Sequence, residues 1–256
     1  MVSRPEGDLK NLTVATSADD TIITVWEDGG AVHLSTSRDS GTFWSLPKKL
    51  SEPGNASWPK LAVAGTMAVV VWTDHANSHS VIQASVSGDR GTTWSVPVVL
   101  SADGDRAWAP QVTAGTGGLV TAIWSSSPQS QPFTRHFWRR KNRPVVGIQS
   151  SSVGEPNGSW SAPVAVASTR DVTAQPQLAT GINCAMAVWT DAGEIRASRS
   201  DIAHTSWSVA SNIGTLDRRE DDAPPRVVGM GSGNFTAIWI TETDSEEVIR
   251  SASTKN

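Results

Sequence analysis

Three aspartates, Asp28, Asp74 and Asp191, each lie two residues beyond a tryptophan. A glycosidase that uses two carboxylates needs them about 5 to 9.5 Å apart, one as the acid and the other as the base or nucleophile. A fold that brings two of these aspartates to one cleft would supply them. The alternative is structural, because an Asp that follows a strand commonly caps the backbone N–H groups of a turn.

Two tryptophans, Trp58 and Trp108, lie shortly before a proline in the connecting segments 51–60 and 101–111. Sugars stack their C–H faces on indole rings while their hydroxyl groups bond to Asp, Asn and Arg side chains. We therefore interpret Trp58 and Trp108 as candidate ligand-binding residues at matching positions. The competing interpretation is that each indole wedges neighbouring structural units together.

A third candidate is the segment 133–143, which is both basic and aromatic and contains Arg135, Trp138 and Arg139. Arg side chains there would hold an anionic sugar, a phosphate or a polyanion. The alternative is a solvated loop without a ligand. The net charge of -4 gives no general field for nucleic acid, and no apolar run is long enough for a membrane span. No His, Cys and Asp spacing predicts a metal site, and no cofactor is expected.

Tryptophans in two registers indicate the repeated unit that must position these candidates. The first series follows short apolar runs and comprises Trp26, Trp72, Trp124, Trp189 and Trp239. The second series opens segments such as WSLP and comprises Trp44, Trp94, Trp160 and Trp207. Each unit of roughly 50 residues holds four short strand signals separated by Gly, Asp, Asn and Pro turns. The pattern predicts an all-β propeller of about five four-stranded blades.

We expect one propeller domain over residues 1–256, with an inserted loop at 125–147. Its blades are expected at about 11–59, 60–110, 111–176, 177–225, and 226–256 together with 1–10. The last blade lacks a fourth strand signal of its own, and Val2-Ser3-Arg4-Pro5 resembles the missing WSxP segment. We therefore expect the N-terminal strand to close this blade and protect its edge. The alternative is a fragment of a longer propeller.

The turn before the second-series Trp carries a motif, Ser-x-Asp-x-Gly-x-Thr-Trp. It is complete in one unit and has Phe43 at the Thr position in another, and its residues are Ser37, Asp39, Gly41, Trp44, Ser87, Asp89, Gly91, Thr93 and Trp94. The Asp accepts bonds from following N–H groups, the Gly takes a positive φ and the Trp buries an apolar face, so we interpret these residues as structural. Two further units keep only traces, Glu155, Ser159 and Trp160 in one and Ser200, Ser206 and Trp207 in the other.

With these motifs the chain resembles the Asp-box (BNR-repeat) proteins of the sialidase-like β-propeller superfamily. The resemblance implies that the motif turns lie away from the ligand-binding face. Sialidases of this family use a Tyr nucleophile and an Arg-Ile-Pro motif, and this chain has no Tyr and no such motif. Family members are often exported, so the resemblance implies an extracellular location, although Met1 to Lys10 lacks the apolar middle of a signal peptide.

These observations favour a non-catalytic propeller that binds a carbohydrate or glycoconjugate. The alternatives are a glycoside hydrolase, or its remnant or fragment, and a scaffold that binds a protein partner. Asp28, Asp74, Asp191, Trp58 and Trp108 are expected on the face opposite the motif turns.

Overall fold

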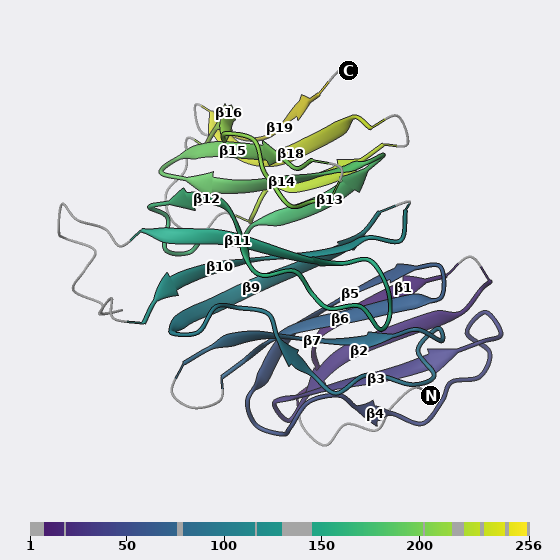
Figure 1. Cartoon of the computed structure of the whole chain (residues 1–256). Helices are drawn as coiled ribbons and strands as arrows, with labels where there is room; N and C mark the ends of the chain where they lie inside the picture. The colour runs from purple at the N-terminus through teal and green to yellow at the C-terminus, as the bar shows by residue number, and fades with distance from the viewer. Residues whose placement is uncertain are drawn as a thin grey trace.

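The chain forms five antiparallel sheets that follow one another in sequence order (Figure 1). The computed structural model describes residues 8–254 except 18, 76–78, 116, 130–144, 202, 217–222, 231–232 and 244–245. Each sheet is a meander, in which strands adjacent in sequence are hydrogen-bonded neighbours. The expected all-β class and the number of sheets are confirmed.

We call the five sheets blades one to five. Blade one contains β1 (Lys10–Thr16), β2 (Ile22–Asp28), β3 (Ala31–Ser37) and β4 (Lys48–Lys49). Blade two contains β5 (Ala56–Ala64), β6 (Met67–Asp74), β7 (Val81–Ser87) and β8 (Val98–Val99). Blade three contains β9 (Asp105–Ala114), β10 (Val120–Pro128), β11 (Val146–Val153) and β12 (Val164–Thr169). Blade four contains β13 (Gln177–Gly181), β14 (Cys184–Asp191), β15 (Glu194–Arg199) and β16 (Ser211–Thr215), and blade five contains β17 (Arg226–Gly229), β18 (Phe235–Thr243) and β19 (Glu246–Ser253).

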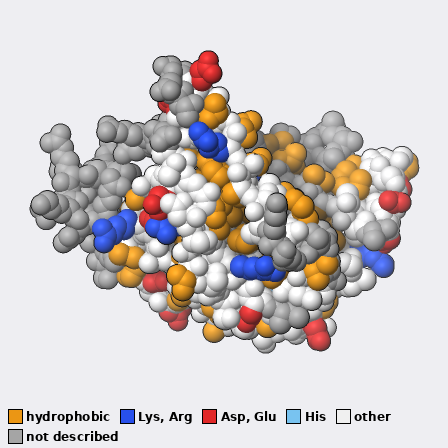
Figure 2. All heavy atoms as spheres, turned by 90° about the horizontal axis from the view of Figure 1, so that it is seen from above, with side chains coloured by type: hydrophobic (Ala, Val, Ile, Leu, Met, Phe, Trp, Pro, Cys, Tyr) orange, Lys and Arg blue, Asp and Glu red, His pale blue; other side chains and the backbone are white. Residues whose placement is uncertain are grey.

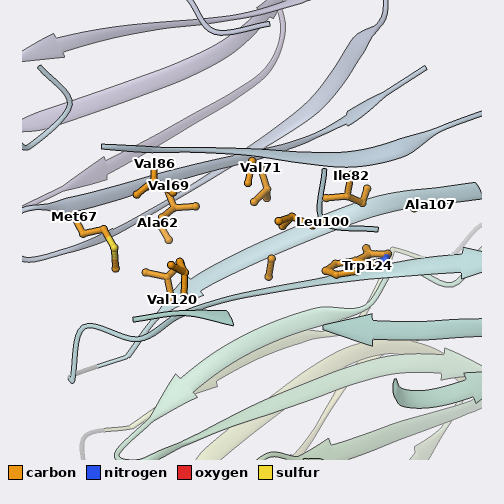
Figure 3. Packing of buried hydrophobic residues seen from close by; sticks show 13 residues of the cluster. Ala62, Met67, Val69, Val71, Ile82, Val86, Leu100, Ala107, Val120 and Trp124 are labelled. Atoms are coloured by element: carbon orange, nitrogen blue, oxygen red, sulfur yellow. The ribbon is translucent and has the colours of Figure 1, made fainter. Parts of the chain in front are cut away.

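Consecutive blades pack face to face, and the first-series tryptophans lie in these interfaces. Trp124 of blade three joins a buried cluster with Val71 of blade two (Figure 3). Trp72, Trp189 and Trp239 take the same place against the blade that precedes each of them. The second strand of an inner blade is therefore covered on both faces, and every residue of β6 is buried. This explains why these strands read as continuous apolar runs rather than as alternating ones.

The second-series tryptophans also pack on the preceding blade. Trp94 contacts the cluster between blades one and two, and Trp160 contacts the one between blades two and three. Trp207 contacts the next cluster and donates its indole N–H to Ser150 Oγ of blade three at 2.9 Å. From blade two onward, both registers thus arise from one requirement, the burial of each blade against its predecessor.

The motif turns connect the third and fourth strands of blades one and two. Asp89 Oδ1 accepts hydrogen bonds from Ser87 Oγ and Thr93 N, both at 2.8 Å, and Thr93 Oγ1 donates to Asp89 Oδ2 at 2.6 Å. Burial raises the pKa of Asp89, but these hydrogen bonds outweigh it and hold the pKa at about 2. Gly91 has φ of +81°, and a Cβ there would come within 2.9 Å of Ile23 in blade one.

Blade four carries a third turn of this kind, of which the sequence pattern shows only a trace without its aspartate. Asp201 Oδ1 accepts from Thr205 N at 2.8 Å, and its Oδ2 accepts from Thr205 Oγ1 at 2.9 Å. These are the bonds that Asp89 makes to Thr93, but Asp201 lies six residues before its Trp where Asp89 lies five before its own. The extra residue makes the motif appear degraded, because a pattern of fixed spacing skips Asp201.

The last blade has three described strands. The sequence predicts that residues 1–10 supply its fourth strand. Residues 1–7 lie outside the described residues, and Lys10 begins β1, which pairs with β2 of blade one. Innermost strands pack in the order β1, β5, β9, β13 and β17. Within the described chain, β17 and β1 make no comparable contact. Blades one and five lie at opposite ends of the array (Figure 1).

We expect Asp89→Ala to lower the free energy of unfolding by about 1–2 kcal/mol, because three hydrogen bonds that hold the turn lose their acceptor. Urea denaturation measures this change. Asp103→Ala is the matched control, since Asp103 is also an exposed aspartate in a connection, and it should change stability by no more than about 0.5 kcal/mol. Equal effects of the two substitutions would contradict a structural role for the turn.

A pH dependence follows from His204, which is 4% exposed and packs its Nδ1 against Thr121 Oγ1 of blade three. Burial lowers the pKa of His204, and the negative charge of Asp201 opposes this shift. The unfolded chain therefore takes up a proton below about pH 6.5 that the folded chain resists, and stability falls as the pH decreases through this range. His204→Gln should flatten denaturation profiles between pH 7 and 5, whereas the exposed His75→Gln should not. Unchanged profiles for His204→Gln would refute the assignment.

Candidate ligand-binding site

A hollow of about 560 Å³ opens where blades two and three meet the connection from blade three to blade four. Such a volume fits a ligand of small-molecule size. It lies at the Asp74 end of β6, whereas the motif turn of the same blade lies at the Ala68 end, since Ala68 pairs with Ser87. The hollow and the motif turns are thus at opposite ends of the sheet. Its described lining residues are Trp58, Thr73, His75, Ser80, Arg106, Trp108, Ala109, Val172, Thr173 and Gln175.

Backbone bulges shape the wall formed by β5 and β9. The register slips between Ser57 and Lys60 in β5, so that Trp58 falls in a bulge, and Trp58 has φ of +59°. In β9 the corresponding slip places Ala109 in the bulge, with φ of +52°. A bulge re-aims the side chains around it, and here it occurs where two blades border the hollow.

The two tryptophans occupy adjacent rather than matching positions in their blades. Trp58 is the bulged residue of β5, and its counterpart in β9 is Ala109. Trp108 instead pairs with Ser125, as Ser57 pairs with Thr73. The expectation of matching positions from the nearby prolines is therefore off by one residue. Both indoles nevertheless line the same hollow.

Glu27 of blade one holds the bulge that carries Trp58. Its Oε2 accepts a hydrogen bond from Trp58 N at 3.4 Å and another from Asn11 Nδ2 at 2.8 Å. Asn11 is the bulged residue of β1 and has φ of +52°. One carboxylate thus braces equivalent bulges of two neighbouring blades. Sequence reasoning missed Glu27, because the position that repeats among the blades is that of its neighbour Asp28, two residues after the tryptophan.

The polar groups of the hollow come from blades two and three. Thr73 is 2% exposed, and among the described residues its Oγ1 has no hydrogen-bond partner. His75 Nε2 lies 3.1 Å from Ser57 Oγ, and His75 N donates to Asn55 O at 2.9 Å, which fixes the ring beside Trp58. Arg106 adds a permanent positive charge.

The third wall is the connection from blade three to blade four, in which the sequence analysis proposed no individual ligand-binding residue. Asp171 Oδ1 accepts from Thr173 N at 3.0 Å, and its Oδ2 accepts from Thr190 Oγ1 at 2.7 Å. Ser125 Oγ donates to Ala174 O at 2.7 Å. These bonds fix Val172, Thr173 and Gln175 against the hollow.

The candidate aspartates lie around this end of the blades but not in the described lining. Asp28 and Asp74 are 4% and 5% exposed at the ends of β2 and β6. Asp191 Oδ1 accepts from Thr169 Oγ1 at 2.8 Å and from Arg170 N at 3.1 Å, so it caps the connection that forms the third wall. Arg135, Trp138 and Arg139 lie outside the described residues.

The described ranges contain no cluster of His, Cys, Asp and Glu side chains that would hold a metal ion. None of the described elements is a helix of sufficient length and apolarity to cross a membrane.

No family model matches the sequence, and no curated protein is significantly similar to it. Solved structures do match the fold. The NanB sialidase from Streptococcus pneumoniae has a TM-score of 0.60 and 11% identity, covering 97% of this chain and 60% of that chain. A Penicillium chrysogenum alpha-L-arabinanase complexed with arabinobiose has a TM-score of 0.53 and 14% identity, covering 96% and 80%.

A Trypanosoma rangeli sialidase has a TM-score of 0.60 and 10% identity, covering 90% of this chain and 43% of that chain. The chain thus spans less than two thirds of the length of either sialidase. The common feature of these structures is the architecture of radially packed antiparallel blades. The chain has a sialidase-like β-propeller fold.

Proposed function

We propose that the chain binds carbohydrate in the hollow formed by blades two and three and the connection from blade three to blade four. The observation that carries this proposal is that Trp58 and Trp108, from two different blades, line one hollow together with hydroxyl, amide, imidazole and guanidinium groups. Apolar C–H faces of a sugar ring stack on an indole, and its hydroxyl groups need donors and acceptors around the rim.

Each group of the lining has a distinct part in such binding. Trp58 is 47% exposed, so its indole is accessible to a ring that enters the hollow. The Thr73 hydroxyl at the floor gains a partner when a sugar hydroxyl reaches it, and this offsets the cost of its burial. Arg106 and Gln175 offer hydrogen bonds to oxygen atoms of the ligand.

The similar structures support a carbohydrate rather than another small molecule. Two are sialidases and one is an arabinanase complexed with arabinobiose. Their shared fold supports carbohydrate as the ligand class, whereas their low sequence identity leaves the individual sugar open. The proposal is restricted to binding, because the paired carboxylates that hydrolysis requires are not among the described lining residues.

A glycan array followed by titration of the tryptophan fluorescence tests the proposal. Trp58→Ala and Trp108→Ala should each weaken binding of a glycan found on the array by about 30-fold, or ~2 kcal/mol, as truncation of an aromatic ring that the ligand covers does. Phe43→Ala is the matched control. It also removes an exposed aromatic ring, but from a motif turn at the opposite end of the blades, and it should leave affinity unchanged.

Two results would overturn this assignment. An array without a bound glycan would remove the carbohydrate proposal. Turnover of aryl glycosides that Asp74→Asn or Asp191→Asn abolishes would replace binding with glycoside hydrolysis. Far-UV circular dichroism of each variant separates these outcomes from loss of the fold.

Glu27 provides a second test, because it braces the bulge of Trp58 without lining the hollow. Glu27→Ala should weaken glycan binding several-fold, since the Trp58 backbone loses an acceptor. Glu27→Gln keeps an oxygen that accepts from both Asn11 and Trp58, so it should restore most of the affinity. If the Gln variant binds as weakly as the Ala variant, the negative charge matters rather than the brace.

A further inference from the structure

One position of the repeat is buried in four blades and exposed in the fifth. The residue before each first-series Trp is 0% exposed at Val25, Val71, Ile123 and Val188, but 44% exposed at Ile238. In the first four blades this side chain packs against the tryptophan-bearing face of the next blade, as Val71 does with Trp124. Ile238 carries the same kind of side chain, and no described blade covers it.

More apolar side chains share the face of Ile238, which we call the blade-five face. Ile240 lies two residues along β18 and pairs with Ile249 of β19, and these residues are 38% and 78% exposed. Val228 of β17 pairs with Thr236 and is 58% exposed. The other face of this sheet, with Phe235 and Trp239, packs on blade four. Figure 2, seen from above, shows hydrophobic side chains exposed in the middle of the view.

The opposite end of the array shows the complementary feature. The residues equivalent to Val14 of β1 are Leu61, Val112, Leu178 and Val227, and each packs into the cluster shared with the preceding blade. Val14 itself is 62% exposed, and the nearby Leu12 is 74% exposed. We call this surface, Leu12 and Val14, the blade-one face. Trp26, on the same sheet, is already buried and stacks on His33 with ring centroids 6.0 Å apart.

We propose that the blade-five face of one copy of this chain docks on the blade-one face of a second copy. The contact continues the interface that already joins consecutive blades. Between blades two and three, Val71 of one blade and Val112 of the next lie in the same cluster. In the proposed contact, Ile238 of one copy takes the position of Val71 and Val14 of the other copy takes the position of Val112. Exposed apolar faces of this kind are characteristic of interaction surfaces.

The contact is head to tail, because the two faces differ. Each copy therefore has one face of each kind to offer. Two copies that use both faces form a closed ring with two-fold symmetry, and an unclosed arrangement continues as a chain of copies. Neither arrangement involves the lining of the proposed carbohydrate site, so this proposal stands or fails independently of it.

Light scattering coupled to size-exclusion chromatography tests the proposal on the full chain. The protein should have a mass of two or more times 27.1 kDa. Ile238→Asp and Val14→Asp should each give monomers, because either charge is buried in the contact. Val209→Asp is the matched control, since Val209 is 93% exposed after the blade-four motif turn and belongs to neither face. A wild-type monomer at about 100 µM, where even a micromolar Kd would populate the contact, overturns the proposal.

Mixing the two variants tests the head-to-tail geometry. Ile238→Asp retains an intact blade-one face and Val14→Asp retains an intact blade-five face, so the mixture should form a 1:1 dimer that does not grow further. If either variant alone still dimerises, like faces pair with like and the proposal is wrong. Circular dichroism and the tryptophan emission maximum of each variant confirm that the monomers are folded.

Discussion

The whole structure depends on the burial of each blade against the one before it. A single sheet of four short strands has two apolar faces and cannot bury both by itself. The tryptophan at the end of each second strand covers the residue before the tryptophan of the preceding blade, as Trp124 covers Val71. Because this contact recurs between each pair of consecutive blades, it stacks the blades in sequence order. The contact is absent at the outer faces of blades one and five, where Val14 and Ile238 are exposed.

The same constraint separates the two ends of the blades. Near the motif turns, side-chain size is restricted by the neighbouring blade: a Cβ at Gly91 would come within 2.9 Å of Ile23, and His204 hydrogen-bonds Thr121. The other ends also pack between blades, through residues such as Ile82 and Ala107, but their connections differ in length and composition. A hollow with two indoles is found at this end, where loops on a rigid scaffold can vary without loss of the fold.

The fold could be predicted because its determinants are periodic in sequence. Trp26, Trp72 and their equivalents mark the blades directly, and the Asp89 turn is local. Features that arise from spatial neighbours could not be predicted. Asp201 recreates the Asp89 turn with one extra residue, and Glu27 supports Trp58 from another blade. Trp58 and Trp108 line one hollow, but their registers differ by one residue, because the bulges and not the nearby prolines set them.

The bulges also explain why the candidate site costs stability. Asn11, Trp58 and Ala109 are non-glycine residues with φ between +52° and +59°, a conformation that L-residues adopt at an expense of about 1–2 kcal/mol. Asn tolerates this region, whereas Trp has no such tendency. A glycine at 58 would relieve the strain but would remove the indole. Because Asn11 and Ala109 adopt the same conformation in the neighbouring blades, the bulge belongs to the fold, and Trp58 uses it to place its ring at the hollow while Glu27 accepts from its backbone N–H.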